Sequence, residues 1–370
     1  MIFGIITHTI HKITDGQIYA YEPYVKEMNL WSKNFDKIVI VAPISFEEIR
    51  VIDAAYQHSN IKVISIPNFN ITSFKNLIKS LFVIPNICWK IFKGMQQVDH
   101  IHLRCPGNVG LLGCVVQVFF SSKVKTAKYA GNWDPKSKQP FTYKFQKWIL
   151  GNTLLSKNIK VLIYGKWSEQ SKNNIPFFTA SYHEHEIEEI AKKDLNKTIK
   201  LLFVGTFSIG KQPLISVRTV HQLSKKGIDV SLDMYGNGSE FKKVQKYIDD
   251  HQLHRIVKLH GNQSKEVVKQ AFQRSHFLIF ISKSEGWPKV VAESMFWSCL
   301  PVSTKVSCVP AMLDYGNRGA LINNNLQEVV EKIESYIDHK KMYVEHVERA
   351  RTWSQQFTLD TFEKAIKELL

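Results

Sequence analysis

Cysteine is scarce in this sequence, and the few that occur form no recognisable pattern. The chain has 370 residues but only five cysteines, and no two of them stand in C-x-x-C spacing. A disulfide framework uses an even set of cysteines, and a zinc site usually uses closely spaced pairs. The sequence therefore argues against both, and we expect reduced, buried thiols, as in a cytosolic protein.

Long hydrophobic runs are also missing. The longest apolar stretch, Val109–Phe120, is too short to cross a bilayer, because a spanning helix takes about 20 residues. The first residues, MIFGIITHTI, lack the basic leader and the small-residue cleavage site of a signal peptide. We expect a cytoplasmic protein, either free or bound peripherally to the inner face of a membrane.

Patterns for nucleic acid and for metal are absent as well. The sequence has no Arg-rich array, no RNA-stacking motif and no helix-turn-helix pattern, so nucleic acid is not an expected partner. It has no Asp-x-Asp triplet to chelate a divalent ion. We therefore expect neither a metal nor another cofactor.

What remains is the composition of a globular protein with a basic surface. Hydrophobic residues make up 44% and charged residues 22%, as is ordinary for packed domains. At about 150 residues per domain, the length predicts two domains. The formal net charge of +16 favours an anionic partner, such as nucleotide phosphates or acidic lipid.

Short apolar runs alternate with helix-like segments through the whole chain. This pattern predicts an α/β fold with parallel sheets covered on both faces. The charged stretch 182–198 is expected to link a domain at 1–180 to a domain at 195–350, although 184–193 fits a solvated helix equally well. The expected strands are Ile2–Thr7, Lys37–Val41, Lys62–Ile66, His100–Leu103, Lys125–Tyr129, Lys160–Tyr164, Ile199–Val204, Asp229–Tyr235, Val257–His260 and His276–Ile281.

The most informative segment is SKSEGWPKVVAESM at 282–295, where an expected strand meets an expected helix. Glu285 falls in the loop and Glu293 near the middle of the helix, with seven residues between them. A carboxylate on an apolar helix face needs hydrogen-bond donors, which a pair of ribose hydroxyls would supply. The helix N-terminus beside Gly286 offers free N–H groups to a phosphate or a sugar oxygen.

This pair of glutamates resembles the signature of glycosyltransferase family 4, also called group 1. The segments VKLHGN at 257–262 and GALINN at 319–324 also resemble that family. The resemblance implies the GT-B fold, in which two Rossmann-like domains face a central cleft, and residues 351–370 form a helix that packs back on the first domain. It also implies a nucleotide diphosphate sugar as donor, retention of the anomeric configuration, and no metal.

The resemblance implies roles for single residues of this segment. Glu285 is expected to meet hydroxyls of the donor sugar, and Glu293 to accept hydrogen bonds from the ribose. The family usually has Gly-Phe-Gly after the first Glu, whereas Pro288 of Gly-Trp-Pro removes one N–H donor. The backbone expected to approach the sugar and the diphosphate belongs to Gly286, Trp287 and Lys289.

Two glycine-containing loops complete the expected donor site. In VGTFSIGK at 204–211, Gly205 begins the loop and Lys211 matches the family's diphosphate-binding lysine. Thr206 stands where the family has arginine, so Lys211 is expected to balance more of the leaving-group charge. Gly236 and Gly238 of YGNG are expected near the nucleotide base, although a plain turn explains them equally well.

The N-terminal domain is expected to bind the acceptor, with Asp15 and Gly16 of the first loop as candidates. The family's histidine near the sugar has no match in YAGNWD at 129–134, where Asn132 or Asp134 is the candidate to replace it catalytically. Two further acceptor-side candidates follow an earlier strand, although a lone histidine is more often structural. They are His102 and Arg104.

Two segments mix lysine with aromatic residues, namely Ser73–Lys93 and Pro140–Leu150. Basic amphipathic segments of this kind lie in the lipid interface. Helices packed on a sheet with their lysines outside explain the pattern equally well, so a peripheral contact with an anionic membrane remains one of two interpretations.

The whole pattern predicts a retaining, metal-independent hexosyltransferase. It would move a sugar from a UDP- or GDP-linked donor to a glycan or lipid-linked acceptor, in bacterial surface polysaccharide synthesis. No general base stands out, although Asp134 and Glu22 are available. The alternatives are a nucleotide-sugar epimerase or phosphorylase of the same fold, and a non-catalytic nucleotide-binding protein whose site has decayed.

Overall fold

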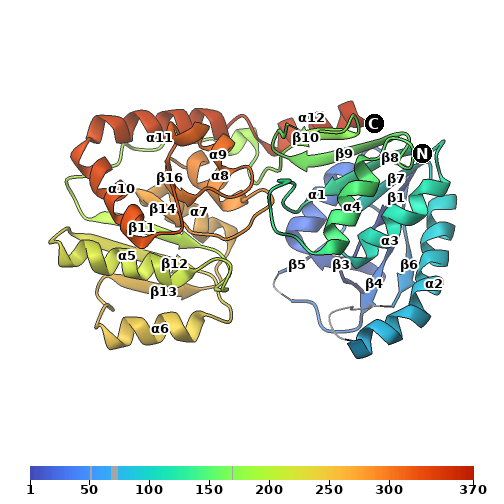
Figure 1. The fold of residues 1–370 in the computed structure, drawn as a ribbon, viewed down its shortest axis with the longest axis horizontal. Coiled ribbons are helices and arrows are strands. Elements are labelled where there is room, and N and C mark those ends of the chain that lie inside the picture. The colour runs from blue at the N-terminus through green and yellow to red at the C-terminus, as the bar shows by residue number, and fades with distance from the viewer. Residues whose placement is uncertain (51, 68–73, 169) are drawn as a thin grey trace. The chain divides into compact units, whose positions relative to one another are not determined.

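The chain folds into two compact units (Figure 1). The computed structural model describes residues 1–50, 52–67, 74–168 and 170–370. The first unit comprises Met1–Phe178 together with Glu363–Leu370, and the second comprises Thr179–Phe362. Each unit has its own sheet, helices and hydrophobic core, so the predicted α/β class is confirmed.

The parallel strands of the first unit run in the order β6, β4, β1, β7, β8, β9, β10. This is the 3-2-1-4-5-6 order of a Rossmann-type sheet with one strand added. The order reverses between β1 and β7, which lie side by side in the middle of the sheet. The strands are β1 (Ile2–Ile6), β4 (Lys37–Ser45), β6 (Ile61–Ile66), β7 (His100–Cys105), β8 (Val124–Tyr129), β9 (Ile159–Tyr164) and β10 (Asn174–Phe177).

An antiparallel extension of this sheet contains Asp15 and Gly16, whose acceptor-side role stays a prediction. They form the two-residue turn between β2 (His11–Thr14) and β3 (Gln17–Tyr21), with φ of 50° and 76°. Asp-Gly suits such a turn because both positions need a positive φ. The pair therefore belongs to a hairpin, which β5 (Asp53–Ala55) extends and β2 joins to β4.

Helices cover both faces of the first sheet because its strands are apolar on both sides. On one face, α1 (Glu22–Ser32) buries Trp31 against Phe3, with ring centroids 5.8 Å apart. On the other face, helices pack through a cluster that includes Ile91, Cys114 and Ile149. These helices are α2 (Phe74–Gln96), α3 (Asn108–Val116), η1 (Gln117–Phe119) and α4 (Phe141–Gly151).

The second unit repeats the same strand order, here β13, β12, β11, β14, β15, β16, with every neighbouring pair parallel. The sequence did not predict its last two strands, because β15 contains Pro301 and β16 has only three residues. The strands are β11 (Ile199–Val204), β12 (Val230–Tyr235), β13 (Val257–Gly261), β14 (Phe277–Phe280), β15 (Leu300–Thr304) and β16 (Ala320–Ile322).

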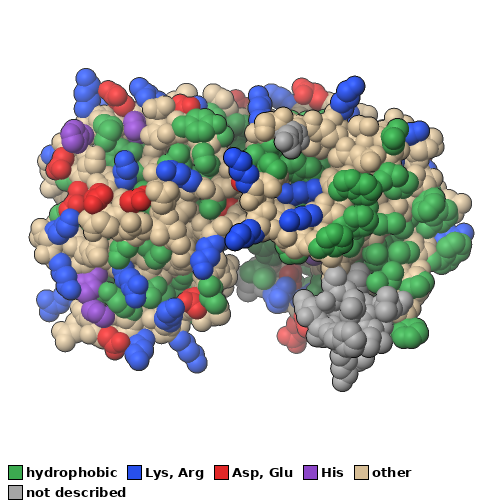
Figure 2. Space-filling view, viewed as in Figure 1, with side chains coloured by type: hydrophobic (Ala, Val, Ile, Leu, Met, Phe, Trp, Pro, Cys, Tyr) green, Lys and Arg blue, Asp and Glu red, His purple; other side chains and the backbone are tan. Residues whose placement is uncertain are grey.

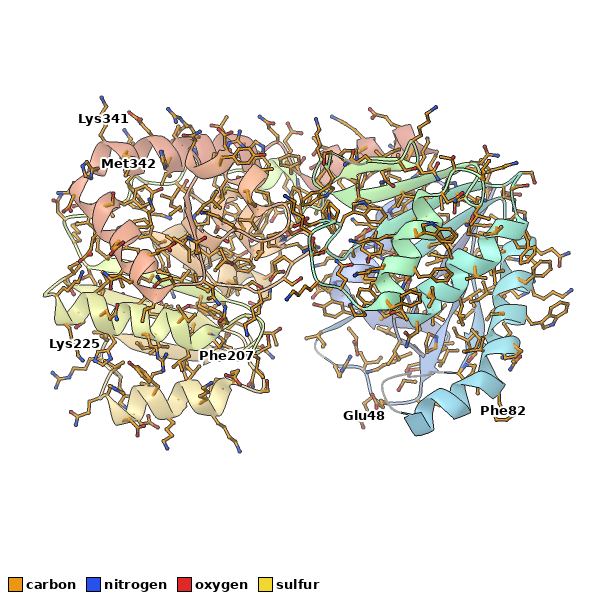
Figure 3. All side chains as sticks on the ribbon, viewed as in Figure 1. Glu48, Phe82, Phe207, Lys225, Lys341 and Met342 are labelled. Carbon is orange, nitrogen blue, oxygen red and sulfur yellow. The ribbon has the colours of Figure 1, made fainter. Side chains whose placement is uncertain are left out.

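The helices of the second unit follow its strands in alternation, and charged side chains such as Lys225 and Lys341 project from them (Figure 3). Pro288 is the N-cap of α8 rather than its first residue. The helices are α5 (Pro213–Lys225), α6 (Phe241–Asp250), α7 (Lys265–Arg274), α8 (Lys289–Phe296), α9 (Val309–Met312), η3 (Asp314–Gly316), α10 (Leu326–Asp338) and α11 (Lys340–Ser354). The last helix, α12 (Leu359–Leu369), begins in the second unit, and its residues from Glu363 on belong to the first.

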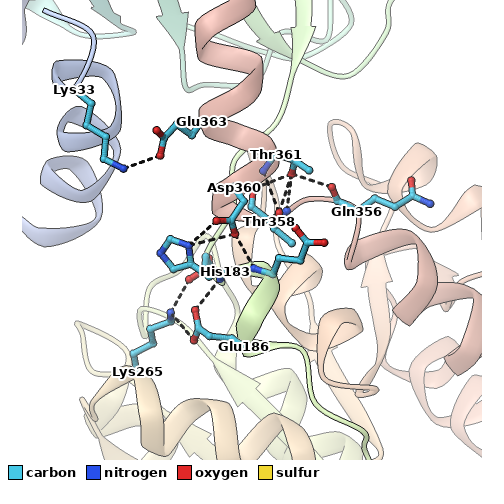
Figure 4. Close-up of polar contacts among 11 residues, drawn as sticks. Lys33, His183, Glu186, Lys265, Gln356, Thr358, Asp360, Thr361 and Glu363 are labelled. Atoms are coloured by element: carbon cyan, nitrogen blue, oxygen red, sulfur yellow. Dashed lines mark hydrogen bonds and ion pairs between the residues drawn. The ribbon is translucent and has the colours of Figure 1, made fainter.

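The charged stretch 182–198 is neither a free linker nor a solvated helix. Its only helical part is η2 (Glu184–Glu186). His183 and the backbone N–H of Glu184 contact the Asp360 carboxylate at the start of α12, and Lys265 lies 3.5 Å from Glu186 (Figure 4). These contacts fix the first part of the segment within the second unit.

Lys193 fixes the last part of the same stretch. Its Nζ donates to four carbonyl oxygens at the C-terminal ends of α7 and α8, at 2.5–3.4 Å. Burial lowers the pKa of Lys193 to about 8. Unpaired carbonyls at a helix end need donors, and one lysine supplies them to two helices at once. The carbonyls belong to Phe272, Ser275, Trp297 and Ser298.

Candidate active site

The candidate site lies where the strand order of the second sheet reverses. Strands β11 and β14 are hydrogen-bonded neighbours there, although many residues separate them in the chain. In such sheets ligands bind beyond the carboxyl ends of the strands at this reversal. The loops 205–212 and 281–288 leave these two ends, and the Lys283 N–H donates to the Gly210 carbonyl at 3.0 Å.

These two loops bring Lys211 and Glu285 into an ion pair. The Glu285 side chain is 11% exposed and the Lys211 side chain 28% exposed, so the lysine is the more accessible of the two. The Lys211 Nζ also lies 4.7 Å from the ring centroid of Phe280. Two residues singled out from the sequence, 74 positions apart, therefore meet in space.

Ser282 and Thr304 hold Glu285 in place, and sequence reasoning missed both. The Ser282 hydroxyl donates to Glu285 Oε1 at 2.5 Å. The Thr304 hydroxyl, at the end of β15, accepts from the Ser282 N–H at 3.1 Å and donates to its carbonyl at 2.7 Å. No local signal marks these residues, because their role depends on the pairing of β14 with β15.

Glu293 lies in the middle of α8, as expected, and is half-buried. Its Oε1 accepts from the Ser181 hydroxyl at 2.5 Å. A small pocket beside it is lined by Ser181, Tyr182, Lys289 and Phe357 among others. Burial, with help from the Glu293 carboxylate, raises the pKa of Tyr182 above its ordinary value. Ser181 and Tyr182 were not predicted, since the contact spans 112 residues.

Trp287, which stands where the family usually has phenylalanine, has a packing role. The Trp287 ring lies 6.4 Å from Trp353 and 5.8 Å from Phe357, centroid to centroid. The Gly286 carbonyl accepts from the Ser307 hydroxyl at 3.0 Å. The Trp287 side chain therefore anchors this loop against the end of α11. The sequence had suggested a role only for the backbone of Trp287.

The glycines of the other two loops allow backbones to touch. A Cβ on Gly236 would lie 2.0 Å from the Gly205 carbonyl oxygen, and one on Gly238 would lie 2.5 Å from the Phe207 oxygen. The φ of Gly236 is 129°, which side-chain-bearing residues rarely adopt. Packing between the loops accounts for these glycines without a ligand, and Thr206 beside them is exposed.

In the first unit, Arg104 is part of a buried ionic cluster. Its Nη1 lies 2.7 Å from Glu27 Oε1, and the Lys128 Nζ lies 3.1 Å from the same oxygen. Burial of these charges is tolerated only because they pair. The cluster sits at the ends of β7 and β8, where Arg104 and Lys128 are register partners.

Asn132 and Asp134 shape the loop that follows β8. The Asn132 Oδ1 accepts from the Asp134 N–H at 2.9 Å, and the Asp134 Oδ1 accepts from the Lys136 N–H at 2.8 Å. Such side-chain-to-backbone bonds are typical of turns. Their catalytic role stays a prediction.

His102 does not belong to the acceptor side, contrary to the expectation. Its side chain has no exposed surface and lies 4.7 Å from the Trp31 ring in the core. Its Nδ1 lies 2.8 Å from the Thr126 hydroxyl oxygen, and burial holds its pKa well below the ordinary value. Alternation along β7 places His100 and His102 together on the face that α1 covers.

No group of three or more His, Cys, Asp or Glu side chains is placed to hold a metal ion in the part of the chain that the structure describes. Within the same residues, no helix combines the length and the apolar character needed to cross a bilayer.

Comparison with known proteins agrees with this arrangement. Residues 185–353 match the model of the family described as glycosyl transferases group 1. An uncharacterized glycosyltransferase of Methanocaldococcus jannaschii is 25% identical over 221 residues, which cover 55% of this chain and 61% of that relative.

Two solved structures extend the likeness to the whole chain. A sucrose-phosphate synthase from Thermosynechococcus elongatus has a TM-score of 0.70 at 13% identity, covering 100% of this chain and 98% of the other. HepE of Anabaena, solved in complex with UDP, has a TM-score of 0.70 at 14% identity, covering 99% and 98%. The protein therefore has the GT-B fold, and its residues 185–353 match the glycosyl transferases group 1 family.

Proposed function

We propose that the protein is a retaining hexosyltransferase that moves a sugar from a nucleoside diphosphate sugar to a hydroxyl of a glycan or lipid-linked acceptor. The observation that carries the proposal is the Lys211–Glu285 pair at the strand-order reversal of the second sheet. A cation and a carboxylate side by side suit a donor that presents a diphosphate next to sugar hydroxyls.

In this proposal the second unit binds the donor. The Lys211 ammonium balances the charge that develops on the departing diphosphate, and Glu285 accepts from sugar hydroxyls. Glu293 accepts from the ribose, so that ribose hydroxyls replace the Ser181 hydroxyl that it binds here. Fixed hydrogen-bond donors that stabilise this charge supply most of the lowering of the activation barrier. The proposal assigns no metal to this site.

The reaction exchanges one bond to the anomeric carbon for another. The bond to the diphosphate oxygen breaks, and a bond to the acceptor oxygen forms on the same face of the sugar. The acceptor proton passes to the leaving phosphate oxygen, so no protein base is required. Asp134 is the candidate base of a rival path.

The proposal assigns the acceptor to the first unit, with Arg104, Asn132 and Asp134 as its candidate contacts. The setting proposed is the assembly of a bacterial surface polysaccharide, with the protein held peripherally at the inner face of the membrane. HepE has been solved with UDP and glucose, and TarM of S. aureus with UDP, which supports a UDP-linked donor before a GDP-linked one.

Thermal unfolding in the presence of UDP, GDP, ADP and CMP tests the donor assignment. A ligand at about 100 times its dissociation constant stabilises the folded state by about 2.7 kcal/mol. We expect a clear rise in melting temperature with one nucleoside diphosphate, and its loss in Lys211→Met. Product analysis with the matching sugar then separates transfer from epimerisation. No shift with any nucleotide in a folded sample would overturn the proposal.

A further inference from the structure

The outer surface of three helices in the first unit carries large apolar side chains in close succession (Figure 2). The helices are α2, α3 and α4, which pack side by side on one face of the sheet. Phe82 projects from α2 into solvent (Figure 3). We call this the α2–α4 surface; its exposed rings are Phe82 (82%) and Trp89 (58%) on α2, Phe119 (74%) on η1 directly after α3, and Phe141 (79%) and Trp148 (56%) on α4.

These rings are not needed to build the core. The inner faces of the same helices already bury Ile87, Ile91, Met95, Ile149 and Leu150 in the cluster beneath the sheet. Single exposed apolar residues are normal on proteins, but a contiguous set of aromatic rings marks a surface that binds something. Packing on the sheet therefore explains the buried side chains of α2 and α4 but not the exposed aromatic ones.

The exposed rings are also ordered among themselves. Along α4, Phe141 stacks on Phe145 at 6.2 Å, and Phe145 stacks on Trp148 at 5.8 Å, with interplanar angles of 6° and 13°. Along α2, Trp89 stacks on Phe92 at 6.0 Å. Aromatic side chains of this kind are favoured at the boundary between lipid headgroups and acyl chains.

The charge of this region is strongly one-sided. From residue 54 to residue 168, which includes all three helices, Asp99 and Asp134 are the only acidic residues, whereas sixteen are Lys or Arg. Most of the formal net charge of +16 therefore arises here. Lys93 lies 4.9 Å above the Trp89 ring, and Lys144 is exposed between Phe141 and Trp148 in sequence.

We infer that the α2–α4 surface is where the protein lies on an anionic lipid bilayer. Aromatic rings would enter the interface while the lysines meet negatively charged headgroups. A second copy of the chain fits this surface less well, because like charges would face each other. Binding to the bilayer would bring the enzyme to a lipid-linked acceptor, and this purpose rests on the proposed function.

Ser73, which begins the first of the two predicted membrane segments, lies outside the described residues.

Co-sedimentation with vesicles tests the inference on the full-length protein. Vesicles of phosphatidylglycerol and phosphatidylcholine are expected to bind the protein, and vesicles of phosphatidylcholine alone to bind it weakly. Phe141→Ser with Trp148→Ser should weaken binding by at least about tenfold. The matched control is Tyr315→Ser in the second unit, whose ring is 79% exposed and whose loss should change nothing.

A charge variant separates the two parts of the interaction. Lys93→Glu with Lys144→Glu should abolish the preference for phosphatidylglycerol, whereas Lys341→Glu on α11 (Figure 3) should retain it. Each variant is checked by its melting temperature and by gel filtration. If both double variants bind vesicles as the parent does, the inference is wrong, and if the ring variant instead turns a dimer into a monomer, a second copy is the partner.

Nucleotide-dependent thermal shifts on the same samples keep the two proposals apart. A protein that responds to a nucleoside diphosphate but never binds vesicles would retain the proposed function and lose this surface. A protein that binds vesicles through the α2–α4 surface without responding to any nucleotide would retain the surface and lose the proposed function.

Discussion

The two units share one strand order but place their ionisable residues differently. In the second unit, Lys211 and Glu285 lie in loops beyond the strands, with side chains 28% and 11% exposed. In the first unit, Lys12 pairs with Asp53 at 2.8 Å, with side chains only 5% and 2% exposed. Arg104 pairs with Glu27 at the carboxyl end of β7. The same fold thus places an ion pair in loops beyond the strands in one unit and within the packed structure in the other.

This difference predicts which charged residues affect turnover and which affect stability. Charged residues of the second unit's loops should matter for turnover and little for stability. Charged residues buried in the first unit should matter for stability first. Lys193 is an informative exception, because it lies in the second unit but donates to backbone carbonyls and should therefore affect stability.

The largest expected effect is that of Glu285→Gln. If Glu285 binds the sugar as proposed, loss of its charge should reduce kcat by about 10² or more, since removing one fixed electrostatic contact of a transition state costs that much. The melting temperature should change little, because glutamine is nearly isosteric with glutamate and keeps an oxygen that can accept from Ser282 and Lys211. Turnover of the donor identified by thermal shift is the measurement.

Glu334→Gln is the matched control for that change. Glu334 also pairs with a lysine, Lys226, in the second unit, but on the outer side of α10. Near-normal turnover of Glu285→Gln alongside an equally active control would remove Glu285 from the site.

Lys193→Met should destabilise the second unit by about 2 kcal/mol. The substitution leaves four carbonyl oxygens at the ends of α7 and α8 without their shared donor, and a buried acceptor left unsatisfied costs about 1–3 kcal/mol. Denaturant unfolding gives the free energy. The neighbouring exposed Lys192→Met should be neutral, and equal stability of the two variants would contradict the capping role.

Asp53→Asn should reveal an acid-sensitive contribution to stability in the first unit. Burial raises the pKa of Asp53, but hydrogen bonds from Lys12 and Arg50 outweigh this and lower it to about 2. A depressed carboxyl pKa stabilises the folded state above the unfolded value and loses that effect as pH falls. The contribution is about 2 kcal/mol at neutral pH.

The measurement is the difference in unfolding free energy between the parent and Asp53→Asn at several pH values. It should be largest near neutral pH and shrink as the pH falls from about 4 to about 2. Exposed Asp338→Asn serves as the reference. A difference that stays constant over this range would mean that the Lys12–Asp53 pair does not depend on charge.

The smallest expected effect is that of Ser282→Ala, which removes the hydroxyl that positions Glu285. One hydrogen bond to a charged group is worth about 1.5 kcal/mol or somewhat more, so kcat should fall by about tenfold while nucleotide affinity stays the same. Ser282→Thr should restore part of the rate. Ser284→Ala, two residues on and exposed, should be silent, and a similar loss in both would point to loop disorder instead.

Much of the fold was predictable because apolar runs and their spacing report burial directly. The runs at β1, β7, β11 and β14 predicted buried parallel strands, and the structure has them. The hairpin at Asp15–Gly16 was missed although its Asp-Gly signal was present. Strand β15 was not predicted because Pro301 argues against a central strand.

Glu285, Glu293 and Lys211 could be predicted as candidate site residues without a structure, because they stand in a recognisable spacing with turn-forming neighbours. Which of them come into contact depends on how the strands pair. The pairing of β11 with β14 brings Lys211 to Glu285, and the pairing of β14 with β15 brings Thr304 to Ser282. The structure likewise decided that His102 is a core residue, since strand alternation fixes a face but only packing shows that both faces of this sheet are covered.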